Sequence, residues 1–168
     1  MEAASPGLRI LLVEDEPANR ALVRSILARS PRPELRGSVL HEAASIAEAA
    51  AVIASQPLDI VLVDVRLPDG SGLDLVAELQ GRRTASPARI VIVSASVLAG
   101  ERAKALSSGA DAFLGKPFGA SELADLLVDV SAGAQDHSSA SPTPRSSFPN
   151  VTSSRSSADR TSAARRPT

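Results

Sequence analysis

The stretch IVLVD at residues 60–64 decides the fold of this chain, and the segment VRLPDG follows it at residues 65–70. Four apolar residues, three of them β-branched, run without alternation into the carboxylate of Asp64. A short continuous apolar run is typical of a strand that is covered on both faces, as in the middle of a parallel sheet. In such sheets ligands bind at the carboxyl ends of the strands. Asp64 is therefore either part of a functional site or simply the cap of the following turn.

Further apolar runs predict four more strands, and helical patterns separate them. The predicted strands lie at residues 8–13, 39–43, 59–64, 90–94 and 111–114. The predicted helices lie at residues 17–29, 45–55, 71–81 and 98–107, and the last begins at Ser121. Strands that alternate with helices through short loops predict an α/β protein, with a doubly wound five-stranded parallel sheet and five helices on its two faces.

Composition narrows the possible functions. The chain has 168 residues, a net charge of −1, no cysteine, and three phenylalanines as its only aromatic residues. It therefore has no thiolate metal ligand, no cysteine nucleophile and few side chains on which a nucleotide base can stack. No apolar run approaches the roughly 18 residues of a membrane span, and the N-terminus lacks a secretory signal pattern. We expect a cytoplasmic protein with neither nucleic acid nor a membrane as partner.

Changes in composition along the chain predict three segments. Residues 1–7 are small and polar, and residues 8–132 carry all of the strand and helix patterns. Residues 133–168 are rich in Ser, Ala, Pro and Arg, with five Arg against two Asp. A segment of this kind cannot bury enough apolar surface to offset its ordering entropy. We predict one folded domain at 8–132, flanked by a disordered N-terminus at 1–7 and a disordered tail at 133–168.

Five polar side chains, three of them carboxylates, lie at or just after the carboxyl ends of the predicted strands. Glu14 and Asp15 follow the first strand, Asp64 ends the third, Ser94 ends the fourth and Lys116 follows the fifth. The carboxyl ends of parallel strands meet at one edge of the sheet, and three crowded carboxylates repel one another unless a cation is present. Ligands that are all oxygen favour Mg²⁺. Because the lysine and the hydroxyl suit phosphate oxygens, the set predicts a phosphoryl-transfer site.

Residues 8–132 resemble the receiver domain of two-component response regulators, of the single-domain chemotaxis type. The resemblance rests on four motifs in order: VEDEP at 13–17, DVRLPDGSG at 64–72, SA at 94–95 and KPF at 116–118. It implies a flavodoxin-like sheet with strand order 2-1-3-4-5. It also implies a cis peptide bond between Lys116 and Pro117.

The resemblance assigns roles to the acidic residues and the lysine. Asp64 would be the phosphoacceptor and become an aspartyl phosphate. Asp15, Asp64 and the backbone carbonyl of Arg66 would hold Mg²⁺ directly, and Glu14 would act through metal-bound water. Lys116 would offset the charge on the transferred group together with Mg²⁺. The phosphoryl donor would be a histidine kinase or a histidine phosphotransfer protein, and the chain would not be an enzyme for other substrates.

The resemblance also implies a switch. Ser94 would move to bond the new phosphoryl oxygens, and Phe113 would rotate into the vacated space. The altered surface would comprise the helix at 98–107, the strand at 111–114 and the last helix, and it would bind a downstream protein. A strand phenylalanine can equally be a plain core residue.

Three alternatives stay open at the level of sequence. The chain can be a receiver fragment of a hybrid histidine kinase or of a multidomain regulator, since EPANR at 16–20 looks like such receivers. It can be a receiver-like scaffold that is never phosphorylated. It can also be a Mg²⁺-dependent phosphohydrolase, although these enzymes usually carry a second acid where this chain has Arg66. We hypothesise that Arg66 shields the acyl phosphate from water.

Overall fold

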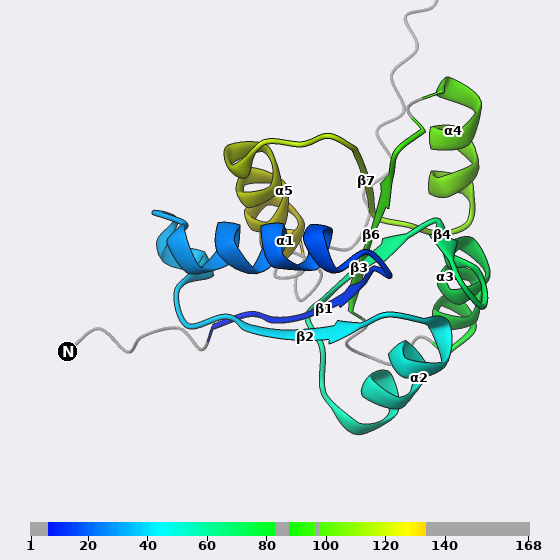
Figure 1. Cartoon of the computed structure of the whole chain (residues 1–168), viewed down its shortest axis with the longest axis horizontal. Helices are drawn as coiled ribbons and strands as arrows, with labels where there is room; N and C mark the ends of the chain where they lie inside the picture. Colours follow the sequence, from blue (N-terminus) through cyan, green and yellow to red (C-terminus); the bar gives the residue numbers. More distant parts are fainter. Residues whose placement is uncertain (1–6, 83–87, 97, 134–168) are drawn as a thin grey trace, which may run out of the picture.

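Five parallel strands form the central sheet of the computed structural model, which describes residues 7–82, 88–96 and 98–133. These strands are β1 (Arg9–Val13), β2 (Val39–Ala43), β3 (Ile60–Asp64), β6 (Arg89–Ser94) and β7 (Ala112–Gly115). Their spatial order is β2-β1-β3-β6-β7, with every neighbouring pair parallel. The predicted fold class and strand order are therefore confirmed (Figure 1).

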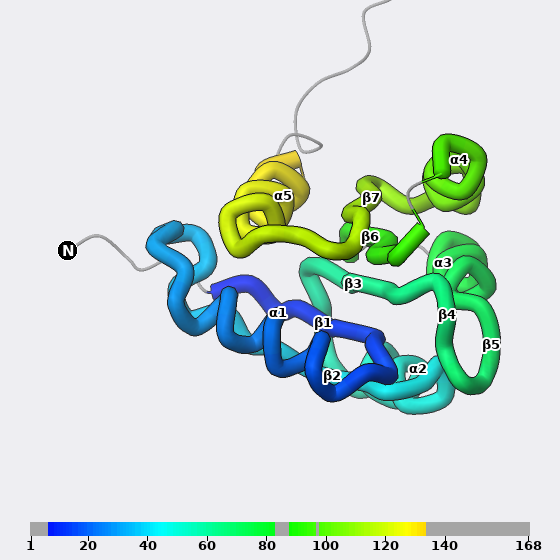
Figure 2. Tube along the Cα trace, turned by 45° about the horizontal axis from the view of Figure 1, so that its top comes forward, coloured from blue at the N-terminus to red at the C-terminus, as the bar shows by residue number. Residues whose placement is uncertain are grey.

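Helices cover both faces of this sheet (Figures 1 and 2). They are α1 (Pro17–Arg29), α2 (Ile46–Ser55), α3 (Gly72–Gly81), α4 (Ala99–Ser107) and α5 (Ala120–Ala132). Alternate residues of a strand point to opposite faces, so each strand feeds two cores. Ile60 and Leu62 pack with α1 and α5, whereas Val61 and Val63 pack with α2, α3 and α4. The unbroken apolar run at 60–63 is thus explained by burial on both faces.

Two short elements lie between the predicted ones. Residues Arg66–Leu67 (β4) and Gly70–Ser71 (β5) form a small antiparallel hairpin directly after Asp64. Residues Pro33–Leu35 form a single 3₁₀ turn ahead of β2. Both were expected only as loops, because runs this short carry no periodicity. The register of the weakly marked β2 is set by its pairing with β1, which aligns Val39 with Arg9.

Arginine–aspartate pairs join neighbouring strands at the amino edge of the sheet. Arg9 opens β1 and binds Asp59, just before β3, with nitrogen–oxygen distances of 2.7 and 3.0 Å. Arg89 opens β6 and binds Asp111, just before β7, at 3.1 Å. The hydrogen bonds from Arg9 lower the pKa of Asp59, outweighing the opposite effect of burial. These pairs lie far from the opposite, carboxyl edge, where the loops that carry the acidic residues begin.

No helix within the described ranges is long and apolar enough to cross a membrane. The segments predicted to be disordered, 1–7 and 133–168, fall outside the described residues except for Gly7 and Gly133.

Candidate functional site

Three carboxylates meet at the carboxyl edge of the sheet. Glu14 and Asp15 directly follow β1, and Asp64 ends β3, whose Val63 pairs with Val13. One oxygen of each carboxylate lies within 4.8 Å of the others. Glu14 is buried, Asp64 is half-buried and Asp15 is exposed. Three hard oxygen donors this close together, open to solvent on one side, fit a divalent cation of the Mg²⁺ type.

Lys116 reaches into the same cluster from the end of β7. Its Nζ lies 2.5 Å from Glu14 Oε2 and 2.5 Å from Asp64 Oδ2. Burial alone would lower the pKa of Lys116, but the hydrogen bonds and charges of Asp64 and Glu14 outweigh burial and raise that pKa above its usual value. The lysine is therefore a permanent cation at neutral pH, bridging two of the three acids. The peptide bond between Lys116 and Pro117 is cis, as the resemblance to receiver domains implies.

Ser94 ends β6 and lies between the acidic cluster and β7. It is 5% exposed, and its hydroxyl oxygen accepts a hydrogen bond from the amide of Ser96 at 3.2 Å. Its carbonyl accepts one from the amide of Lys116 at 2.7 Å, which fixes the lysine backbone to the strand that carries Ser94. The register of β3 against β6 pairs Asp64 with Val93, so Ser94 extends one residue beyond the carboxylate.

The segment after Asp64 folds back over the carboxylate. The amide of Arg66 donates to Asp64 Oδ1 at 2.9 Å, and the amide of Gly72 donates to the carbonyl of Val65 at 2.8 Å. The side chain of Arg66 is exposed. Its backbone carbonyl belongs to β4, the first strand of the hairpin that follows Asp64.

Arg20, which the sequence analysis missed, supports the acidic loop from α1. Its Nη1 donates to the carbonyl of Glu14 at 2.7 Å and to the carbonyl of Asp15 at 2.9 Å. The guanidinium therefore fixes the backbone from which both carboxylates project. In the sequence it is one of sixteen arginines, and only its place in the first turn after the acids distinguishes it.

Phe113 lies on β7, outside the acidic cluster. It is half-buried in the core shared with α3 and α4, and the guanidinium carbon of Arg102 on α4 lies 6.0 Å from the ring centre. Two leucines at either end of α4, Leu98 and Leu106, are 67% and 42% exposed. The surface predicted for a downstream partner thus carries exposed apolar side chains.

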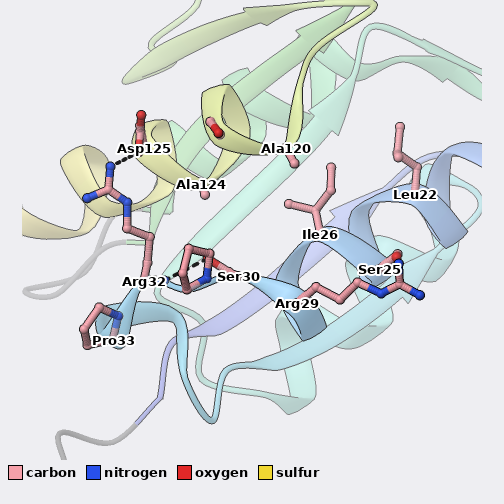
Figure 3. Close-up of a pocket in the computed structure, with 12 residues that line it drawn as sticks. Leu22, Ser25, Ile26, Arg29, Ser30, Arg32, Pro33, Ala120, Ala124 and Asp125 are labelled. Atoms are coloured by element: carbon pink, nitrogen blue, oxygen red, sulfur yellow. Dashed lines mark hydrogen bonds and ion pairs between the residues drawn. The ribbon is translucent and has the colours of Figure 1, made fainter.

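A groove of about 740 Å³ lies between α1 and α5 (Figure 3). Its walls include Leu22, Ile26 and Arg29 on α1 and Ala124 on α5. Figure 3 shows Arg32 crossing from the end of α1 to bind Asp125 of α5. Arg29 is the arginine of α1 that lines the groove, because Arg20 binds the acidic loop and Arg24 pairs with Glu42.

Residues 10–128 match the sequence model of the response regulator receiver domain family. The chain belongs to this family. It is 35% identical over 120 residues to the response regulator protein PilR of Pseudomonas aeruginosa, an alignment that covers 71% of this chain and 25% of PilR. The receiver therefore corresponds to about a quarter of that relative's length.

Solved receiver structures share the fold. A CheY-like receiver from Methanospirillum hungatei superposes with a TM-score of 0.67 at 25% identity, covering 79% of this receiver and 99% of the other chain. The receiver domain of the sensor histidine kinase PA1611 from Pseudomonas aeruginosa superposes with a TM-score of 0.65 at 28% identity, covering 75% of this chain and 98% of the other. That structure holds a magnesium ion in its active-site cleft. In this receiver, the acidic cluster at the same kind of sheet edge is the candidate metal site.

Proposed function

We propose that this receiver accepts a phosphoryl group from a phosphohistidine onto Asp64 and signals through protein contacts. The observation that carries the proposal is the joint position of three carboxylates and Lys116, with the ammonium 2.5 Å from Asp64 Oδ2. A carboxylate nucleophile beside an acidic metal site and a fixed cation is the arrangement that phosphoryl transfer requires.

In the proposed reaction a carboxylate oxygen of Asp64 forms a bond to phosphorus while the bond from phosphorus to the donor histidine nitrogen breaks. The donor nitrogen keeps the electron pair and leaves as neutral imidazole once it has taken up a proton. Asp15, Asp64 and the Arg66 carbonyl would hold Mg²⁺, and Glu14 would bind through water. Bound Mg²⁺ would supply positive charge next to the transferring oxygens. Lys116 supplies a second positive charge from the other side, through a side chain already fixed by Glu14.

The groove between α1 and α5 supports a protein donor. Helix α1 begins two residues after Asp15, so a partner on α1 lies next to the acidic cluster. The exposed Leu22 and the guanidinium of Arg29 in the groove suit an acidic, amphipathic helix. A histidine kinase or histidine phosphotransfer protein that presents such a helix could bring its phosphohistidine to Asp64. This function implies a cytoplasmic location, where kinases draw on ATP.

The output surface in this proposal is the face of α4, β7 and α5. Phosphorylation adds acceptor oxygens near Ser94, whose hydroxyl now only accepts from Ser96 among the described residues. Movement of Ser94 would free space for Phe113, which packs against the core that includes Ala105 of α4. The exposed Leu98 and Leu106 give that face an apolar character suited to a protein partner.

The test uses the 168-residue chain with Mg²⁺ and acetyl phosphate, followed by intact mass measurement. We expect one phosphoryl group on the wild type and on the Asp74→Asn control, and none on Asp64→Asn. Asp74 is an exposed acid of α3 with no hydrogen bond or ion pair to another described residue. An Asp64→Asn variant that is still modified would refute the assigned acceptor.

A second measurement separates a switch from a silent scaffold. Beryllofluoride with Mg²⁺ mimics the acyl phosphate, and amide spectra report which residues respond. Shifts at Ser94, Lys116 and the α4–β7–α5 face that vanish in Asp64→Ala support the proposal. An unchanged wild-type spectrum would favour the scaffold, and turnover of a small phosphate ester would favour a phosphohydrolase.

A further inference from the structure

The tip of the β4–β5 hairpin is fastened to the start of α2, a helix that contributes no residue to the acidic cluster. Asp69 Oδ1 accepts a hydrogen bond from the amide of Ile46 at 2.9 Å, and Asp69 Oδ2 accepts one from the amide of Ala47 at 3.0 Å. These bonds lower the pKa of Asp69. Figure 2 shows the hairpin beside α2 and α3 at this end of the molecule.

Helix α2 does not depend on Asp69 alone for its cap. The Ser45 hydroxyl accepts from the amide of Glu48 at 3.2 Å, and the Glu48 carboxylate accepts from the amide of Ala44 at 2.7 Å. The pair is a variant of the capping box, because Ser45 is the N-cap and Glu48 accepts from the residue before it. Asp69 takes the two first-turn amides that the box leaves over, and it does so from a segment 22 residues away. Its contacts therefore connect two parts of the chain rather than merely ending a helix.

The same connection between β2 and α2 also holds the acidic pair. The carbonyl of Ala43, at the end of β2, accepts a hydrogen bond from the amide of Glu14 at 2.9 Å. The segment 43–47 thus touches the Glu14 backbone at one end and Asp69 at the other. Because both contacts are to backbone groups, one at the end of β2 and the other at the start of α2, they form a short link between the loop that carries Glu14 and the hairpin that follows Asp64.

From Asp69 the link continues to the proposed metal ligand. Arg66 pairs with Ser71 and Leu67 with Gly70, so the tip and the Arg66 carbonyl belong to one two-residue ladder. Gly70 has φ of 153°, and a Cβ there would lie 3.0 Å from Ile46 Cδ1. The hairpin therefore lies directly against the first residue of α2, and the hydrogen bonds of Asp69 hold it there.

We propose that Asp69 is a positioning residue for the metal site, which fixes the Arg66 carbonyl relative to Glu14 and Asp15 through the start of α2. The inference rests on the proposed function, because that function makes the Arg66 carbonyl a metal ligand. Asp69 itself touches neither the acidic cluster nor the phosphoacceptor. Its effect reaches the site only through backbone geometry, as partners behind a metal ligand do.

The experiment compares Asp69→Asn and Asp69→Ala with Asp74→Asn in the full chain. All three remove one negative charge near the start of α3, but only the first two remove a contact to α2. Mg²⁺ affinity is measured by calorimetry at a temperature below the onset of unfolding. The initial rate of phosphorylation by acetyl phosphate is measured as a function of Mg²⁺ concentration.

We expect the Asp69 variants to bind Mg²⁺ about three- to ten-fold more weakly than Asp74→Asn, a smaller loss than for a direct partner of a ligand. Phosphorylation should need correspondingly more Mg²⁺ yet approach the wild-type rate at saturation. A purely structural role would lower the unfolding midpoint without raising the Mg²⁺ concentration that phosphorylation requires. Equal Mg²⁺ affinity of Asp69→Asn and Asp74→Asn would overturn the inference and leave the proposed function intact. A wild type that binds no Mg²⁺ would remove both.

Discussion

Gly72 opens α3 immediately after the hairpin, and replacing it with alanine should test how tightly β3, the strand that ends in Asp64, is packed. A Cβ at this position would lie 2.0 Å from the carbonyl oxygen of Asp64 and 2.8 Å from Val63 Cγ1. The first of these atoms belongs to the backbone and cannot turn away. The amide of Gly72 also donates to the carbonyl of Val65, which limits how far α3 can retreat.

The expected cost follows from these distances. Carbon and oxygen that are not bonded normally stay at least about 3.3 Å apart, so the backbone at Asp64 or Gly72 must move by roughly 1 Å. Overpacking of this kind costs about 1–3 kcal/mol or more. Alanine recovers about 0.5–1 kcal/mol because it favours a helix more than glycine does. The net loss should therefore be about 1–2 kcal/mol in the free energy of unfolding.

Gly81, at the other end of α3, provides the matched control. A Cβ there meets no atom within 4 Å, so Gly81→Ala should be neutral or slightly stabilising. Far-UV circular dichroism in urea is the suitable assay, since the chain has no Trp or Tyr for fluorescence. The midpoint of Gly72→Ala should fall by roughly 1 M relative to wild type.

The same displacement should also reach the chemistry. A misplacement of about 1 Å at a reacting group can cost on the order of 100-fold in rate. We therefore expect Gly72→Ala, when still folded, to accept phosphate from acetyl phosphate far more slowly than Gly81→Ala. Unfolding midpoints of the two variants within about 0.3 M of each other would show that this packing argument is wrong.

Three further predictions concern charge. The hydrogen bonds from Arg9 lower the pKa of Asp59. The stability that they contribute is therefore complete above the unfolded pKa of about 3.9 and is lost as the pH falls through the lower pKa of the folded state. Asp59→Asn should flatten this part of the curve of stability against pH, and an unchanged curve would contradict the assignment. Arg66→Asn should shorten the lifetime of the acyl phosphate in a dephosphorylation time course, and an equal lifetime would remove the shielding role. Arg29→Glu should slow phosphorylation by a protein donor but not by acetyl phosphate, whereas Arg82→Glu, outside the groove, should leave both rates unchanged; equal loss with both donors would exclude docking at Arg29.

The sequence was sufficient for the central sheet because its strongest signals are local. The apolar runs at 60–63 and 90–93 are buried on both faces, and the carboxylate and hydroxyl that end them mark the functional edge. The ends of the elements moved by a residue or so, as they do wherever a cap rather than periodicity sets the boundary. Helix α5, for example, begins at Ala120, one residue before the expected start at Ser121, with Gly119 as its N-cap.

Arg20 and Asp69 lay beyond the reach of sequence reasoning for a physical reason. Each binds backbone groups. Because nearly every residue carries the same backbone groups, the sequence does not show which of them a side chain will bind. Arg20 reaches the carbonyls of the acidic loop, and Asp69 reaches amides 22 and 23 residues away. An aspartate after proline in a turn reads first as a local turn residue. Only the three-dimensional proximity of the hairpin to α2 distinguishes this contact from that local interpretation.

The contacts of Asp64 also bear on how the proposed nucleophile becomes available. Asp64 Oδ1 accepts from the backbone amide of Arg66, whereas Oδ2 accepts from the side chain of Lys116. The hairpin fixes the backbone contact, whereas the lysine side chain is flexible. Its ammonium can stay bound to Glu14 when it leaves Asp64. Three carboxylates and one ammonium leave two formal negative charges, which a divalent cation balances. We therefore expect cation binding to weaken the hold of Lys116 on Oδ2, so that this oxygen can attack phosphorus while the lysine turns to the incoming phosphoryl oxygens.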